Sequence, residues 1–342
     1  VAKLEKANTA ATRVFCFGIG TDLNTHLLDR ITEATRSASQ YVLPEEDIEV
    51  KVSSFYTRIK SPTLTQVGLA WGPGVKPSKV YPGTMTDLFR GDQLMVFGRY
   101  GGSGPGAVTV SGLLKGKARK FVMEGTFPDE SRERPWVARL WATRRVGYLL
   151  DEIRLRGESA ELKDEVAALA RDFGIVTPYT SYLILEDERS KVALNVLAPG
   201  ARVLSEMAED KESGGRAKDW YDSLAHRKDG RQAVESRNDS ALLKGAGNAQ
   251  EGYSDRGLQK GGTGGNYARQ CRNVGTKTFY QNGSQWIDAD VQRHASAKRI
   301  QVRFGTDEYF ALCRQAPEAA QWLSVGRNLQ IALSGVVYEI ME

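Results

Sequence analysis

Gly18 and Gly20 flank one isoleucine in a Gly-x-Gly turn that follows an apolar run and precedes a helix start. Such a turn can place the phosphates of a dinucleotide at the helix N-terminus. The dinucleotide fingerprint needs a third glycine, and Leu23 occupies that position. We therefore interpret Gly18–Gly20 as a tight strand-to-helix turn, with a nucleotide-dependent oxidoreductase or transferase as the alternative. Two further glycine-rich stretches, 101–106 and 261–265, lack the Gly-Lys-Ser/Thr ending of a phosphate loop and predict a hairpin and a linker.

Residues that commonly perform acid–base or nucleophilic catalysis are scattered along the chain. His26, His226 and His294 each lack a nearby nucleophile and an acid that would orient the imidazole. We expect His26 on the surface of a helix. The adjacent Asp151 and Glu152 occupy helix positions where solvation explains them. The sequence therefore predicts a non-enzymatic protein with no catalytic residues.

The three cysteines, Cys16, Cys271 and Cys313, are widely spaced and form no CxxC or Cys/His metal-ligand pattern. Zinc binding is not predicted. Cys16 lies inside the apolar run and is interpreted as a small core residue. A Cys271–Cys313 disulfide could form in an oxidising compartment, and the sequence leaves that pairing open.

The chain has 342 residues and a formal net charge of +5. The positive surplus lies mainly in residues 61–185, where it is interspersed with acidic residues and forms no long Lys/Arg run. This pattern favours a mixed, solvated surface, so a nucleic-acid partner is not predicted. The sequence also predicts no transmembrane segment, because no stretch is apolar enough to cross a bilayer.

Residues 1–60 alternate between helix and strand patterns. We predict the end of a helix at 1–12, a strand at 13–19, a helix capped by Asn24 or Thr25, and a strand at 39–43. A third helix follows, with acidic residues in its first turn, where they favour a helix N-terminus. The first strand reads as buried on both faces and needs parallel neighbours on both sides. We therefore expect a truncated, doubly wound, Rossmann-like half-sheet whose other half precedes Val1.

The two helices that follow these strands each carry an apolar stripe at helical spacing. The stripes consist of Leu27, Leu28, Ile31 and Ala34 in the first helix, and of Ile48, Val52, Phe55 and Ile59 in the second. We predict that both stripes pack against the sheet.

From residue 61 the apolar period changes from 3.6 to 2. Alternating runs at 63–71, 92–100, 106–114 and 117–124 are separated by Gly/Pro/Asp turns and predict an antiparallel, sandwich-like β region over 61–130. Residues 131–189 predict a helical hairpin and a closing strand. In it, a helix at 136–155 buries its tryptophans and tyrosines, a second runs from Ala160 to Phe173 with caps at Ser159 and Gly174, and a strand occupies 175–185.

Residues 190–268 lose periodicity and are poor in apolar residues, which predicts a flexible linker with short helical patches. Residues 269–342 predict a compact α+β module. Its expected elements are strands at 276–281 and 299–304, a helix at 306–314 and a strand pair within 328–340.

Several segments together resemble one protein family. They are 14–25 (VFCFGIGTDLNT), 41–42 (YV), 49–56 (EVKVSSFY), 87–94 (DLFRGDQL), 96–100 (VFGRY), 139–150 (RLWATRRVGYLL) and 174–181 (GIVTPYTS). In this order they resemble von Willebrand factor type A (vWA) domain proteins of the VIT and inter-alpha-trypsin inhibitor heavy chain kind, bacterial members included. The resemblance covers roughly residues 10–185, and the C-terminal module resembles the tail of bacterial members.

The resemblance implies an adhesion or protein-interaction protein, exported or attached to the cell envelope, with a protein or extracellular ligand as partner. It implies a metal-ion-dependent adhesion site (MIDAS) that holds Mg²⁺, or Mn²⁺ or Ca²⁺, through an Asp-x-Ser-x-Ser loop, a threonine and an aspartate. In the family order these ligands precede residue 14, so no metal ligand is assigned in this chain. Thr21, Asp22 and Asn24 are expected in a loop on the ligand-binding face. A metal-free structural scaffold is a further alternative.

Overall fold

The computed structural model describes the following residues: 1–10, 12–131, 133–175, 179–180, 211–246, 271–282, 285–291, 294, 297–315 and 318–342. The chain forms two compact units, each built from two stretches of sequence. Unit 1 comprises Val1–Arg156 and His226–Gly247, and unit 2 comprises Gly157–Ala225 and Asn248–Glu342. This grouping differs from the predicted boundaries. Residues His226–Gly247 follow the helical hairpin in the sequence but belong to unit 1.

Unit 1 begins with the predicted order of helices and strands. Helix α1 (Ala2–Ala7) is followed by β1 (Cys16–Ile19), α2 (Thr25–Ala34), β2 (Ser39–Val42) and α3 (Ile48–Ile59). β1 and β2 pair in parallel, with Cys16 opposite Ser39 and Ile19 opposite Val42. Helices α2 and α3 start at side-chain caps. Asn24 accepts a hydrogen bond from Leu27 N, and Asp47 accepts one from Val50 N.

The buried faces of this first α/β part differ from the prediction. β1 buries Cys16, whereas Phe17 and Ile19 are 38% and 56% exposed. In α2 the buried side chains are polar: Thr25, His26, Asp29 and Thr32. Leu27, from the predicted stripe, is exposed. Leu28 of the same stripe is half-buried and packs against the apolar cluster of Tyr41, Leu43 and Val234, so the predicted stripe holds only in part.

Helix α3 follows its predicted stripe only in part. Phe55 is buried and lies edge-to-face with Phe17, their ring centroids 4.8 Å apart. Ile48, at the first position of the helix, is 46% exposed. Phe55 is therefore the stripe residue that packs on β1.

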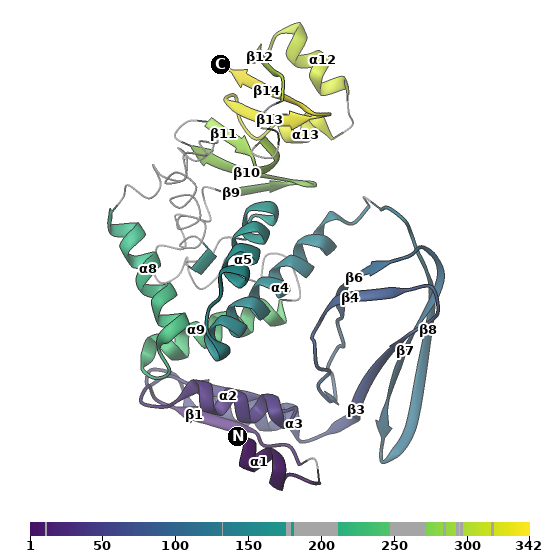
Figure 1. The fold of residues 1–342 in the computed structure, drawn as a ribbon, viewed down its shortest axis with the longest axis vertical. Coiled ribbons are helices and arrows are strands. Elements are labelled where there is room, and N and C mark those ends of the chain that lie inside the picture. The colour runs from purple at the N-terminus through teal and green to yellow at the C-terminus, as the bar shows by residue number, and fades with distance from the viewer. Residues whose placement is uncertain are drawn as a thin grey trace. The chain divides into compact units, whose positions relative to one another are not determined.

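The β region is antiparallel, as predicted. β3 (Pro62–Trp71), β5 (Leu88–Phe89), β7 (Gly104–Leu114) and β8 (Lys117–Phe127) form a sheet in the order β5-β3-β7-β8, and β4 (Lys76–Tyr81) pairs with β6 (Phe97–Gly101). Figure 1 shows the long strands β3, β7 and β8 with the shorter β4–β6 pair beside them. The prediction missed β4, whose sequence is largely polar. It was wrong on 101–106, which joins the two sheets instead of forming a hairpin, because β6 pairs with β4 and β7 with β3 and β8.

Helix α4 (Pro135–Arg156) packs along α9 (Arg231–Gly245). Gly147 permits this approach, since a Cβ atom there would lie 2.7 Å from both Leu243 Cβ and Lys244 N. α9 and α8 (Lys211–His226) lie inside the range predicted as a flexible linker, and α9 buries Val234 and Leu243. Small and polar residues fill the rest of its interface, so the scarcity of apolar residues was a misleading guide. The remainder of that predicted linker lies outside the described residues.

The aromatic residues of α4 are not all buried. Leu140, Trp141 and Ile153 are buried and Tyr148 is half-buried, but Trp136, in the first turn, is 53% exposed. The prediction that the tryptophans of this helix belong to the core is therefore wrong for Trp136.

Unit 2 contains α5 (Ala160–Phe173) with both predicted caps. Leu162 N donates to Ser159 Oγ, and Gly174 ends the helix in the left-handed conformation with φ of 60°. The strand predicted at 175–185 lies mostly outside the described residues, and the described Tyr179 and Thr180 are helical.

The C-terminal part of unit 2 is a six-stranded mixed sheet in the order β12-β14-β13-β11-β10-β9. Its elements are β9 (Cys271–Val274), β10 (Lys277–Asn282), β11 (Gln285–Asp288), a 3₁₀ turn (Ala289–Val291), β12 (Arg299–Arg303), α12 (Asp307–Gln315), α13 (Ala319–Leu323), β13 (Leu329–Leu333) and β14 (Val336–Met341). The predicted strands, helix and strand pair are all present as β10, β12, α12, β13 and β14. The apolar core includes Phe279, Leu329, Ile331 and Ile340. Cys313 is a free thiol.

Candidate interaction loop and the buried polar network behind it

The loop between β1 and α2 carries the three residues predicted on the ligand-binding face. Asn24 caps α2, with its Oδ1 2.9 Å from Leu27 N. Thr21 contributes its carbonyl oxygen, which accepts from Gly230 N at 2.9 Å. Asp22 is exposed and has no ion-pair partner among the described residues. Of the three residues, only Asp22 therefore has a charged side chain free to meet a ligand.

The Gly-x-Gly turn has a structural explanation in each glycine. A Cβ atom on Gly18 would lie 2.6 Å from the ring of Tyr41, so the strand can pass over this ring only as glycine. Gly20 has a φ of +87°, which side-chain-bearing residues rarely adopt. Close packing and turn geometry explain both positions without a bound phosphate.

The segment before α9 closes one side of this loop. Thr25 donates through both its backbone N and its hydroxyl to the carbonyl of Lys228, at 2.9 and 3.2 Å. Arg231 forms a two-pronged ion pair with Glu45, which follows β2. The α2 N-terminus therefore already has protein partners for part of its free N–H groups.

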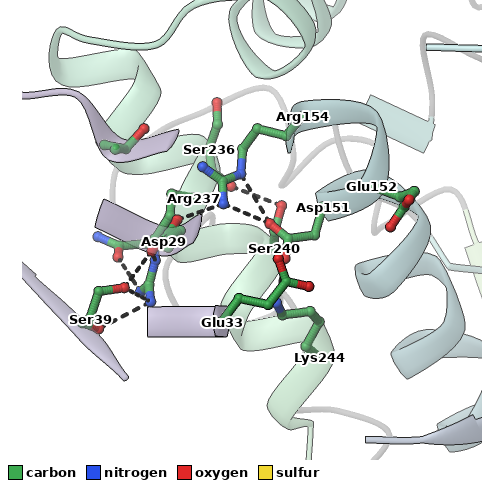
Figure 2. A network of polar contacts seen from close by, with 12 residues as sticks. Asp29, Glu33, Ser39, Asp151, Glu152, Arg154, Ser236, Arg237, Ser240 and Lys244 are labelled. Atoms are coloured by element: carbon green, nitrogen blue, oxygen red, sulfur yellow. Dashed lines mark hydrogen bonds and ion pairs between the residues drawn. The ribbon is translucent and has the colours of Figure 1, made fainter. Parts of the chain in front are cut away.

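Behind the loop, the inner face of α2 lies in a network of buried charges (Figure 2). Asp29 accepts from Arg154 Nη2 at 2.6 Å, from Tyr41 OH at 3.0 Å and from Arg237 Nε at 3.3 Å. Ser39 also donates to Asp29. The Asp29 carboxylate therefore joins α2, α4, α9 and β2, the elements that supply these partners.

A second carboxylate extends the network along α4. Asp151 accepts from Arg154 Nη2 at 2.7 Å and pairs with Lys244 of α9. Burial by itself raises the pKa of Asp151, but Lys244 and Arg154 outweigh it and lower the pKa to about 2. The Tyr41 phenol has a raised pKa because it is buried beside Asp29, so it stays protonated and donates.

The sequence did not reveal this network. His26 and Asp151 were expected in solvated positions, but His26 is buried and the Asp151 side chain is only 13% exposed. The Glu152 side chain is the more exposed of its pair, at 43%. Burial, followed by the nearby Arg154 and Lys228, lowers the pKa of His26. The two arginine partners of Asp29 come from segments far along the chain, so no local motif marks them.

The network can fix geometry but has little chemistry of its own. Each oxygen of Asp29 and Asp151 accepts at least one hydrogen bond from a hydroxyl or a cation. Carboxylates paired with cations in this way are poor general bases. Within the described part of the chain, no three or more His, Cys, Asp or Glu side chains are grouped so as to hold a metal ion.

Known proteins share sequence with this chain, although no family model matches it. The von Willebrand factor A domain-containing protein 5A of Homo sapiens is 26% identical over 58% of this chain and 26% of its own length. The inter-alpha-trypsin inhibitor heavy chain H2 of Sus scrofa is 24% identical over 54% of this chain and 21% of its own length. A vWA domain-containing protein of Dictyostelium discoideum is 25% identical over 58% of this chain and 22% of its own length.

These relatives confirm the resemblance to vWA domain proteins over about half of the chain. More narrowly, inter-alpha-trypsin inhibitor heavy chains are among them. A solved structure, a von Willebrand factor type A protein from Catenulispora acidiphila, covers 53% of this chain at 15% identity and a TM-score of 0.30. The chain spans about a quarter or less of the length of the curated relatives it matches.

In the described ranges, each helix is too short or too polar to cross a bilayer.

Proposed function

We propose that this chain is part of a non-enzymatic adhesion or protein-interaction protein. The sequence similarity to vWA domain proteins and inter-alpha-trypsin inhibitor heavy chains carries this proposal. In the proposal, the complete protein binds a protein or extracellular ligand through a divalent cation such as Mg²⁺. The cation ligands are an Asp-x-Ser-x-Ser loop, a threonine and an aspartate from outside the printed sequence, and the cation's open position takes a carboxylate of the partner.

The loop at the carboxyl end of β1 supports a role for this chain on the ligand side. In open α/β sheets, ligands bind at the carboxyl ends of parallel strands. Asp22 is exposed there, and Thr21 is fixed by its bond with Gly230. We assign Asp22 a contact with the partner and Asn24 the positioning of the loop through its cap.

Titration of Mn²⁺ by calorimetry tests the cation site. A longer chain that includes the Asp-x-Ser-x-Ser loop should bind one Mn²⁺ tightly, while the 342-residue chain should show no tight site. The longer chain should also lose partner binding in EDTA. Absence of a tight site in the longer chain, or binding that EDTA leaves unchanged, would count against a cation-dependent function and favour a metal-free scaffold.

A variant separates partner contact from cation binding. In the longer chain, Asp22→Ala should weaken partner binding and leave the Mn²⁺ affinity unchanged. Glu49→Ala, also exposed but on α3, is the matched control and should change neither. Loss of Mn²⁺ binding in the Asp22 variant would instead make Asp22 a ligand of the cation.

The rival function is a nucleotide-dependent enzyme that uses the Gly18–Gly20 turn. It predicts a rise in melting temperature with NAD or ATP. The packing of Gly18 against Tyr41 and the capped N-terminus of α2 favour the adhesion proposal. A saturable thermal shift with either nucleotide would reverse that preference.

A further inference from the structure

Strand β8 is exposed to an unusual extent. It lies at the edge of its four-stranded sheet, with β7 as its neighbour on the other side (Figure 1). At its centre Phe121, Val122 and Met123 are 49%, 60% and 51% exposed. A long edge strand with an apolar centre is a site where another strand adds, unless the protein covers it.

The face of β8 that carries Phe121 and Met123 borders a cavity. This cavity has a volume of about 840 Å³ and is lined mainly by apolar side chains of the two sheets, including Leu69, Trp71 and Val110. Val122 does not line it and belongs to the other face of β8. The strand therefore presents an unpaired backbone edge beside an incompletely filled apolar space.

The charges on β8 are arranged in order along the strand. Lys117, Arg119 and Lys120 precede the apolar centre, and Glu124 follows it. All four are exposed and have no ion pair within the described part of the chain. Lys120, Val122 and Glu124 alternate with Phe121 and Met123, so the charges at 120 and 124 and the cavity-lining side chains lie on opposite faces.

We propose that β8 is a self-association strand, which pairs antiparallel with β8 of a second copy around a two-fold axis at Val122. In this register Lys120 lies opposite Glu124 of the second copy, and Phe121 lies opposite Met123 of the second copy. The two-fold axis repeats each pair, giving two ion pairs on one face and two apolar pairs on the cavity face. The inference is independent of the proposed cation site.

Other arrangements of two β8 strands fit less well. A parallel pair in register would set Lys120 against Lys120. An antiparallel pair moved by two residues would set either Lys120 or Glu124 against Val122. A single register therefore matches both the charges and the apolar residues, which argues for a second copy as the occupant.

Sedimentation equilibrium of the 342-residue chain, whose monomer mass is 37.7 kDa, tests the proposal. The chain should form dimers in a concentration-dependent way. Lys120→Glu and Glu124→Lys should each weaken dimerisation about tenfold or more, because each reverses two symmetry-related pairs. Lys298→Glu, an exposed position in the other unit, should have no effect and is the matched control.

Mixing the two variants gives the decisive result. The Lys120→Glu chain carries glutamate at both positions and the Glu124→Lys chain carries lysine at both, so an equimolar mixture should regain dimers. This recovery also demonstrates that the single variants are folded. A mixture that stays monomeric, or an unaltered chain that is monomeric at every concentration, would overturn the proposal. If the chain is monomeric and the β8 amides are nevertheless protected from hydrogen exchange, another segment of the chain covers the strand.

Discussion

The C-terminal sheet and the α2 interface bury their residues in opposite ways. The C-terminal core consists of apolar side chains such as Phe279, Leu329 and Ile331, all supplied by elements of the last third of the chain. The inner face of α2 instead buries Asp29, whose partners Arg154 and Arg237 lie 125 and 208 positions along the chain. In the C-terminal core, the apolar pattern of each element indicates which of its residues are buried. The α2 interface exists only when distant segments have come together.

The largest effect is expected from Asp29→Ala. It leaves the buried Arg154 and the half-buried Arg237 without this partner, which should lower the free energy of unfolding of unit 1 by about 3–5 kcal/mol. Hydrogen exchange resolved by segment would measure the loss in β2. Glu33→Ala, on the exposed side of the same helix, should change stability by less than about 0.5 kcal/mol. Equal effects of the two variants would mean that the network contributes no more than a surface pair.

The apolar core should respond to Leu329→Ala. Removing this buried side chain should destabilise the C-terminal sheet by about 2–5 kcal/mol through lost burial and a residual cavity. The same exchange experiment should show faster exchange in β13 and β14 and no change in β1 or β2. A loss spread evenly over both units would show that the chain unfolds as one cooperative body.

Gly18→Ala tests the close contact between β1 and β2. The added methyl group would overlap the Tyr41 ring and should cost about 1–3 kcal/mol. Gly83→Ala is the matched control, because nothing lies within 4 Å of a Cβ atom there. Thermal unfolding would separate the two, and a Gly18→Ala variant as stable as the parent would contradict the packing account of this glycine.

The smallest effect concerns pH. Because the pKa of His26 is lowered in the folded state, the unfolded chain binds a proton there more readily, so unit 1 should lose stability as the pH falls below about 6.5. The slope from one such group cannot exceed about 1.4 kcal/mol per pH unit. Denaturant unfolding between pH 5 and 8 measures it. His26→Gln should flatten the curve, and an unchanged slope would place its origin elsewhere.

Local signals in the sequence predicted most of the elements. The caps at Asn24, Ser159 and Gly174 are where residue type placed them, because a cap is a contact between near neighbours. The alternating runs and the Gly/Pro/Asp turns between them likewise predicted the β region. β4 was not predicted, because an exposed strand has no alternation of apolar and polar residues.

The buried site could not be predicted in the same way. Asp29 on α2 and Arg154 on α4 look like ordinary surface charges of two helices, and nothing within four residues of either shows that they meet. Residues around Ser236 and Ser240 look like linker because they are small and polar, yet that smallness lets α9 pack closely. Only the assembled fold identifies such pairs, whereas the resemblance to vWA proteins was visible from collinear motifs alone.

The docking of α9 against Gly147 has a consequence for synthesis. The ribosome releases Arg156 about ninety residues before the end of α9, an interval of roughly 5 to 20 seconds at ordinary elongation rates. During that time Arg237 and Lys244, two cationic partners of the network, have not yet been synthesised. The network is therefore complete only after α9 has been translated. A protein cut at Arg156 would lack α9 and both of these partners.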